Sequence, residues 1–384
     1  MKKIIGTLCL LVGAAMLLVP SMSYSEDVIK IGVTTPLTGP VAASGAYIAY
    51  GCKITEDFLN QSGGIMGKKV RVIIEDNKSN PKEAVATAEK LIVRDKVPVM
   101  MGAWSSTYTL AVMPKLMEYG VPMVVETSSS GKITTSGNPW IFRISPTSEM
   151  EAIAFGKKVD RFNIKKADFL VVNNDWGLGA AKQFSKMLKS KGIKVGVQET
   201  MDAGAQDMSA QLAKIKASGG DTLFVTTSVE QLTLLLKQAK EQRLPSRIIT
   251  TGGSSSPDQL IEQAGAAAEG SYHLLFFAPW FPESAPNPQI AKRFVDEWNK
   301  RGHNFAGLTE GFRGYDGIMT IAAGIEAAKS TKPDDIRKAL WGVKVHGVNG
   351  DIAFIKQGPK GKESAQNVPN VYIVTIRNGK VALP

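Results

Sequence analysis

The residues best suited to chemistry follow a short apolar run in the sequence "MMGAWSST", residues 100–107. Trp104, Ser105, Ser106 and Thr107 stand just after Gly102 and before a stretch with helical spacing. The first turn of a helix has free N–H groups and a positive dipole end, so a hydroxyl there can help to bind a ligand anion. The tryptophan adds an apolar wall. These residues predict a binding site for a small ligand. The alternative is that Ser105 or Ser106 is only the helix N-cap.

Strand-like and helix-like stretches alternate along the chain from Val28 to about Pro279. With 384 residues the chain is long enough for two cores. Alternation of this kind predicts an α/β fold of two doubly wound lobes with parallel sheets. Three helical segments follow Pro279, and the stretch "NVYIVTIRNGKVAL" near the end has strand character. Because helices without intervening strands must cover existing sheets, we expect the chain to cross between the lobes more than once.

Ligands of open α/β sheets bind beyond the carboxyl ends of the strands. In this sequence those positions are loops rich in Ser, Thr and Gly, with Trp104 in the first lobe and Trp176 in the second. The loops are "TPLTGPVAASG", "GAWSST", "ETSSSGK", "NNDWGLG", "TTSVE" and "TTGGSSS". None of them contains a histidine. They predict that hydroxyl and amide groups of two facing lobes converge on a shared ligand.

The N-terminus has the features of a secretory signal peptide over residues 1–25. Lys2 and Lys3 precede an apolar run over residues 4–19, and small residues precede an expected cleavage before Glu26. The mature chain would keep one cysteine, Cys52, and therefore no internal disulfide. We expect a periplasmic protein, and a retained N-terminal anchor is the alternative.

Composition and motifs argue against several other classes of protein. The formal charge of +11 is spread along helices without a run of five or six like charges, so we expect no nucleic-acid partner. His273, His303 and His346 are not at metal-ligand spacing. The stretches "GGIMGKKV" and "WGLGAAK" depart from phosphate-loop and dinucleotide motifs, and no G-x-S-x-G sequence occurs. We therefore expect no cofactor, no metal and no catalysis.

Several stretches together resemble the branched-chain amino-acid type of periplasmic solute-binding protein of ABC transporters. They are "IKIGVTTPLTGPVAASG", "DNKSNPKEAVATAEKLIVRDKVPVMMG", "PWIFRISPTSEMEA" and "YDGIMTIAAGIEAAK". The resemblance implies a type I periplasmic binding fold with a ligand cleft between two lobes and chain crossings near residues 145–148, 275–279 and 350–354. The N-terminal lobe would comprise 26–146 plus 277–352, and the C-terminal lobe 147–276 plus 353–384. It also implies an inner-membrane ABC permease as partner and a monomer.

The resemblance also implies roles for specific residues. It implies that Ser105, with its neighbour Ser106, holds a ligand carboxylate, that Thr127 and Ser129 hold the carboxylate and amino group, and that Trp176 is an aromatic wall. This sequence departs from the pattern at two positions. Gly252 stands where leucine binders place an acid, and Ser228 stands where they place an aromatic residue. Possible substitutes for the missing acid are Glu126, Asp175, Glu230 and Glu310.

These observations predict a binding protein that captures an amino acid, branched-chain or related, and delivers it to a permease. One alternative keeps the fold and binds an aromatic or keto carboxylate or an amide. Another is a sensory binding module that reports ligand status to a receptor. An exported hydrolase using the cleft is the remaining alternative, and it would need a nucleophile–base pair that the sequence does not display.

Overall fold

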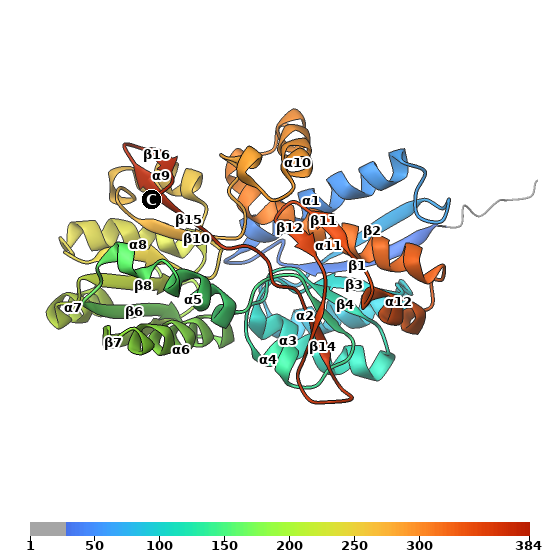
Figure 1. The fold of residues 1–384 in the computed structure, drawn as a ribbon, viewed down its shortest axis with the longest axis horizontal. Coiled ribbons are helices and arrows are strands. Elements are labelled where there is room, and N and C mark those ends of the chain that lie inside the picture. The colour runs from blue at the N-terminus through green and yellow to red at the C-terminus, as the bar shows by residue number, and fades with distance from the viewer. Residues whose placement is uncertain (1–27) are drawn as a thin grey trace, which may run out of the picture.

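The structure, a computed structural model, describes residues 28–384, which form two α/β lobes lying side by side (Figure 1). Each lobe is built on its own seven-stranded sheet, most of whose strands run parallel, so the predicted fold of two doubly wound parallel-sheet lobes is confirmed. A separate antiparallel pair consists of β11 (Val345–Gly347) and β12 (Gly350–Ile352). The predicted signal peptide, residues 1–25, lies outside the described residues.

The sheet of the first lobe has the strand order β13-β14-β5-β4-β3-β1-β2. Its strands are β1 (Ile29–Thr35), β2 (Val70–Asp76), β3 (Met100–Gly102), β4 (Met123–Val125), β5 (Ile141–Arg143), β13 (Ile355–Gln357) and β14 (Ser364–Gln366). The helices of this lobe are α1 (Ala42–Gln61), α2 (Pro81–Glu89), α3 (Ser106–Tyr119), α4 (Lys132–Thr135), α10 (Pro288–Lys300), α11 (Leu308–Ala328) and α12 (Pro333–Leu340). Only β13 runs antiparallel to its neighbour.

The sheet of the second lobe has the strand order β16-β15-β10-β9-β8-β6-β7. Its strands are β6 (Lys166–Val172), β7 (Lys194–Met201), β8 (Thr222–Thr226), β9 (Arg247–Thr250), β10 (Tyr272–Leu275), β15 (Tyr372–Arg377) and β16 (Lys380–Ala382). The helices of this lobe are α5 (Ser148–Gly156), α6 (Asp175–Ser190), α7 (Ser209–Ser218), α8 (Val229–Glu241) and α9 (Pro257–Ala264). The C-terminal strand β15 pairs antiparallel with β10, and β16 pairs antiparallel with β15 at the edge of the sheet.

Local sequence signals explain where several helices begin and end. Asn80 precedes α2, and its side chain accepts hydrogen bonds from the backbone N–H groups of Lys82 and Glu83 while Pro81 occupies the first helical position. This is the cap expected from the sequence. Helix α3 ends at Gly120, whose φ of 64° is in the left-handed region that glycine adopts without strain.

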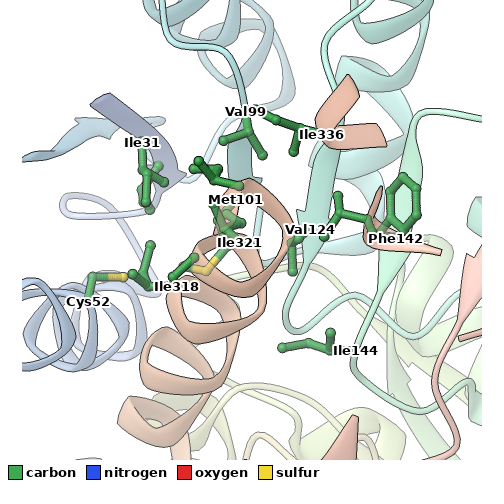
Figure 2. Close-up of a cluster of buried hydrophobic side chains, with 14 of the residues drawn as sticks. Ile31, Cys52, Val99, Met101, Val124, Phe142, Ile144, Ile318, Ile321 and Ile336 are labelled. Atoms are coloured by element: carbon green, nitrogen blue, oxygen red, sulfur yellow. The ribbon is translucent and has the colours of Figure 1, made fainter. Parts of the chain in front are cut away.

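Helix α11 lies against the first sheet and supplies much of that lobe's core. Ile318 and Ile321 of α11 are fully buried, and they pack in one apolar cluster with Met101 of β3 and Val124 of β4 (Figure 2). The one cysteine of the described chain, Cys52, is buried in the same cluster. The helical segments after Pro279 therefore cover the first sheet, as the sequence led us to expect.

The chain passes between the lobes in the segments 144–147, 276–287 and 367–371, which join elements of different sheets. The third passage differs from the expected position near 350–354, and assigning all of 353–384 to the C-terminal lobe is wrong. Strand β14 pairs in parallel with β5, with Ala365 opposite Phe142 and Gln366 opposite Arg143. The buried side chain of Gln366 bonds Arg143, so residues 355–366 belong to the first sheet.

Candidate functional site

A cavity of about 760 Å³ lies between the lobes at the carboxyl ends of their strands. The first lobe contributes the loop after β1, the loop after β3 and the start of α3. The second lobe contributes the loops after β6 and β7 and parts of α8 and α9. Four of the eight predicted site residues line it, namely Trp104, Ser105, Trp176 and Ser228. The other four, Ser106, Thr127, Ser129 and Gly252, are not among its lining residues.

Ser105 stands at the N-cap position of α3, yet its hydroxyl makes no capping hydrogen bond. Its backbone is extended, with φ −83° and ψ 143°, and its backbone carbonyl accepts the N–H of Thr109. A cap that served only the helix would use the hydroxyl to satisfy an N–H group of the first turn. The hydroxyl of Ser105 therefore makes no bond to the first turn of α3, and the residue lines the cavity at the positive end of the helix dipole.

The serine-rich loop, residues 126–131, is held mainly by bonds within the protein. The hydroxyl of Ser106 accepts the N–H of Ser130 at 3.1 Å. The hydroxyls of Ser129 and Ser148 lie 3.2 Å apart, and the hydroxyl of Thr127 donates weakly to Glu126 at 3.4 Å. These side chains stabilise the loop 126–131 next to the cleft. None of these residues is among those that line the cleft.

Arg143, which the sequence analysis did not single out, organises that loop. Its side chain is fully buried and donates to the carbonyl oxygens of Ser128 and Ser130, at 3.1 and 2.6 Å, and to Thr134 and Gln366. Burial lowers the pKa of its guanidinium to about 9. The sequence feature that could have identified Arg143 is its position as a charged residue inside the apolar strand stretch "WIFRI".

Trp104 and Trp176 meet across the cleft from opposite lobes. Their ring centroids are 6.4 Å apart with an angle of 64° between the planes, which is an edge-to-face contact. Trp104 has a φ of 67°, and its N–H donates to a carboxylate oxygen of Glu126 at 3.0 Å. The N–H of Trp176 donates to the side chain of Asn174, which caps α6. The backbone of each tryptophan is thus held by a side chain of its own lobe.

Gly252 supports Trp176 from behind. A Cβ atom at residue 252 would lie 2.5 Å from Nε1 and from Cζ2 of the Trp176 indole, and the φ of Gly252 is +86°. Only glycine fits both the backbone and the ring at this position. Gly252 was aligned with the acid of leucine binders, and in the structure its N–H donates to Glu151 at 2.6 Å.

The four acids considered as substitutes occupy different places. Glu230 alone lines the cleft, two residues after Ser228 at the start of α8. Asp175 instead joins the lobes, because its carboxylate bonds Lys132 at 2.9 Å and the hydroxyl of Thr107 at 3.3 Å. Glu126 and Glu310 are buried and are not among the lining residues.

Glu230 is mostly buried, and both its carboxylate oxygens are shielded from solvent. Within residues 28–384 neither oxygen accepts a hydrogen bond of good geometry, although the Ser228 hydroxyl and a backbone N–H lie close to the carboxylate. Burial raises the pKa of Glu230, and the nearby backbone N–H and Ser228 hydroxyl oppose that shift only partly. A shielded carboxylate without a partner is costly, and a cation placed against it would remove that cost.

Comparisons of the sequence and of the structure with known proteins agree with a fold of two lobes around a ligand cleft. A sequence profile of the family described as periplasmic binding protein matches residues 28–380. The chain belongs to this family. Its members are solute-binding proteins and not enzymes, which removes the exported hydrolase. Among the described residues no helix is long and apolar enough to cross a membrane.

Relatives of this periplasmic binding protein include amino-acid binders. The leucine-, isoleucine-, valine-, threonine- and alanine-binding protein of Pseudomonas aeruginosa is 29% identical over 90% of this chain and 91% of its own length. The crystal structure of a leucine-binding protein from Thermotoga maritima is 26% identical with a TM-score of 0.81, covering 93% of this chain and 97% of that one.

A relative from Rhodopseudomonas palustris HaA2 has a different ligand. The crystal structure of this solute-binding protein of an ABC transporter is a complex with p-hydroxybenzoic acid. It is 25% identical to this chain with a TM-score of 0.79, and it covers 92% of this chain and 95% of that one. The same fold thus accommodates a carboxylate that has no amine.

Proposed function

We propose that the protein captures an amino acid, branched-chain or related, in the cleft between its lobes and delivers it to the inner-membrane permease of an ABC transporter. The observation that carries this proposal is the shielded carboxylate of Glu230, which lies in the cleft wall and faces only the Ser228 hydroxyl and a backbone N–H, neither of which forms a hydrogen bond of good geometry with it. A ligand ammonium would supply the missing partner. Glu230 would then do what the acid at the aligned position, here Gly252, does in leucine binders.

Ser105 provides the opposite end of the site. Its uncommitted hydroxyl and the start of α3 come from the first lobe, whereas Glu230 comes from the second. A ligand whose carboxylate contacts Ser105 and whose ammonium contacts Glu230 touches both lobes at once. Such a ligand stabilises the closed arrangement over an open one, because only the closed arrangement offers both contacts.

The apolar part of the ligand would lie against Trp104, Trp176 and the neighbouring Tyr108, Leu234 and Val41, all of which line the cleft. Micromolar affinity requires about 8 kcal/mol. Hydrogen bonds to charged groups contribute about 1.5–3 kcal/mol each, and burial of one aliphatic side chain contributes about 1.5–3 kcal/mol. Two or three such bonds with one buried side chain reach that order. The amino-acid relative from Pseudomonas aeruginosa supports the same ligand class.

The experiment compares two ligands that differ in the amine. Titration calorimetry with L-leucine and with 4-methyl-2-oxopentanoate, its keto acid, should give heat for the first and at least tenfold weaker binding for the second. Glu230→Gln should remove this preference, while Glu241→Gln, an exposed acid on the same helix, should leave it unchanged. Absence of heat with leucine, isoleucine, valine and other amino acids would contradict the proposal.

A carboxylate without an amine is the second candidate. The two tryptophans and Tyr108 in the lining favour an aromatic ring, and the Rhodopseudomonas palustris relative binds p-hydroxybenzoic acid. Calorimetry with p-hydroxybenzoate decides between them. Tight binding of that acid, unaffected by Glu230→Gln, would replace the amino acid by an aromatic carboxylate. A sensory module would share this chemistry, and capture of the permease by the liganded protein distinguishes transport from sensing.

A further inference from the structure

Four charged side chains are buried together behind Trp104, where the lobes meet. We name them the Arg313 cluster: Arg313 and Glu310 of α11, Glu126 after β4, and Glu151 of α5. Each has at most 4% of its surface exposed. Glu126, Glu310 and Arg313 belong to the first lobe, and Glu151 belongs to the second. Neither the cleft lining nor the proposed ligand contacts account for this cluster.

One hydrogen bond from Arg313 joins the cluster to the second lobe, and a second bond, from Gly252 to Glu151, lies within that lobe. Arg313 Nη2 donates to the carbonyl oxygen of Gly253 at 2.6 Å, which is a bond between lobes. Glu151 accepts the N–H of Gly252 at 2.6 Å. The guanidinium carbon of Arg313 also lies 5.2 Å from the ring centroid of Phe276, in the segment that leaves β10. Arg313 is therefore enclosed by both lobes and by a crossing segment.

The cluster holds three carboxyl groups and one guanidinium, and several of their atoms have no hydrogen-bond partner in the described chain. These atoms are Oε2 of Glu126 and of Glu151, both carboxylate oxygens of Glu310, and Nε and Nη1 of Arg313. Nε of Arg313 is 3.3 Å from Glu310, within ion-pair distance but without hydrogen-bond geometry. Fully ionised, the cluster would bury an excess of negative charge, which is unfavourable away from water.

We propose that closure of the lobes is coupled to proton uptake by this cluster, with a carboxyl of Glu126 or Glu310 becoming protonated as the lobes close. A protonated carboxyl donates a hydrogen bond and removes one excess charge. Opening the lobes separates Glu151 and Gly253 from Arg313 and admits water, so the carboxyl groups regain hydration and release the proton. The coupling does not depend on which ligand the cleft binds.

The direction of the effect follows from the acids in the closed arrangement. Burial raises the pKa of Glu126 and of Glu310 to about 7, and that of Glu151 to about 8. The closed form therefore binds more protons than the open form between about pH 5 and pH 8, and its population falls as pH rises through this window. One group whose pKa returns from about 7 to 4.5 on opening changes the closed-to-open ratio about tenfold between pH 6 and pH 9.

Three further titratable groups face the cluster. Glu230 of α8 approaches Glu310 from the cleft side and raises the pKa of Glu310 further. Cys52 of α1 lies on the side of Glu126, which raises the thiol's pKa after burial has done so. Asp316 of α11 accepts the N–H groups of Val348 and Asn349, at 2.6 and 3.3 Å, and burial raises its pKa to about 7. Burial raises the pKa of Glu230, Cys52 and Asp316, as it does for the carboxyl groups of the Arg313 cluster.

The test measures closure without any ligand. Spin labels on Lys82→Cys in α2 and Lys182→Cys in α6, both exposed, report the distance between the lobes by double electron–electron resonance. We expect the closed-distance population to be detectable at pH 6 and the closed-to-open ratio to fall about tenfold by pH 9. A distribution that is the same at both pH values, whether closed or open, would overturn the proposal with no variant required.

Variants of the cluster test which carboxyl group takes up the proton. Glu310→Gln and Glu126→Gln keep the shape of each side chain, and at least one of them should flatten the pH dependence while its far-UV circular dichroism matches that of the parent. Glu326→Gln, an exposed acid on the same helix, should retain the full dependence. Equal pH dependence in all three variants would overturn the assignment to this cluster. Because no ligand is present, failure of the amino-acid proposal leaves this result unaffected.

Discussion

Replacing Gly252 by alanine should strain the wall that carries Trp176. Alanine at a φ of +86° costs about 1–2 kcal/mol, as for other non-glycine residues in the left-handed region. The added methyl would also lie 2.5 Å from the indole of Trp176, so the ring must move by about 1 Å, and overpacking of this size costs about 1–3 kcal/mol. We expect a stability loss of about 2–5 kcal/mol and a displaced Trp176 in the cleft.

Gly179→Ala is the matched control for this substitution. Gly179 lies in α6 of the same lobe, and no atom outside its chain neighbours and the backbone of its own helix lies within 4 Å of the position of an added Cβ, so alanine there should stabilise the helix by about 0.5–1 kcal/mol. Urea unfolding followed by circular dichroism measures both variants, and near-UV spectra report the tryptophan environment. Equal stability of the two variants, or an unchanged near-UV spectrum for Gly252→Ala, would refute the packing argument.

Three other predictions concern single side chains. Ser105→Ala should weaken binding of L-leucine about tenfold or more in calorimetry, since a hydrogen bond to a charged ligand group contributes about 1.5–3 kcal/mol; an unchanged affinity would make Ser105 a purely structural residue. Lys132→Ala removes the exposed pair with Asp175 and should change affinity by less than about threefold at 0.15 M salt, so a large loss would show that this pair holds the lobes together. His273 bonds Thr250 and Ser271 in the core, and burial lowers its pKa to about 3. The unfolded chain therefore binds a proton on this imidazole below about pH 6.5, whereas the folded chain does not. Between pH 7 and pH 4.5 the parent should lose about 2.5 kcal/mol more stability than His273→Gln; parallel pH profiles would contradict this.

The features predicted well from the sequence depend on local patterns. Alternating strand and helix periods identified both sheets, and Asn80 with Pro81 identified the start of α2 because a cap acts through neighbouring residues. Ser105 was placed at a strand end before a helix, and the structure has it at the N-cap position in the cleft lining. The two tryptophans likewise lie where their loops predicted.

The features that the sequence did not indicate depend on contacts between distant residues. Gln366 reaches Arg143 across 223 positions, and no local pattern in the short stretch "SAQ" shows that it joins the first sheet. The bonds that occupy Ser129 and Ser106, the ring behind Gly252 and the Arg313 cluster arise in the same way. The isolated charge in the stretch "WIFRI" could have drawn attention to Arg143, but no local pattern identifies its partners.

A crystal structure of the protein grown with L-leucine tests the central claim most directly, namely that the cleft holds a small acid between the two lobes. We expect the ligand carboxylate within about 3 Å of the Ser105 hydroxyl and the ammonium within about 3 Å of the Glu230 carboxylate. An empty cleft, or a leucine that contacts neither Ser105 nor Glu230, would contradict the account.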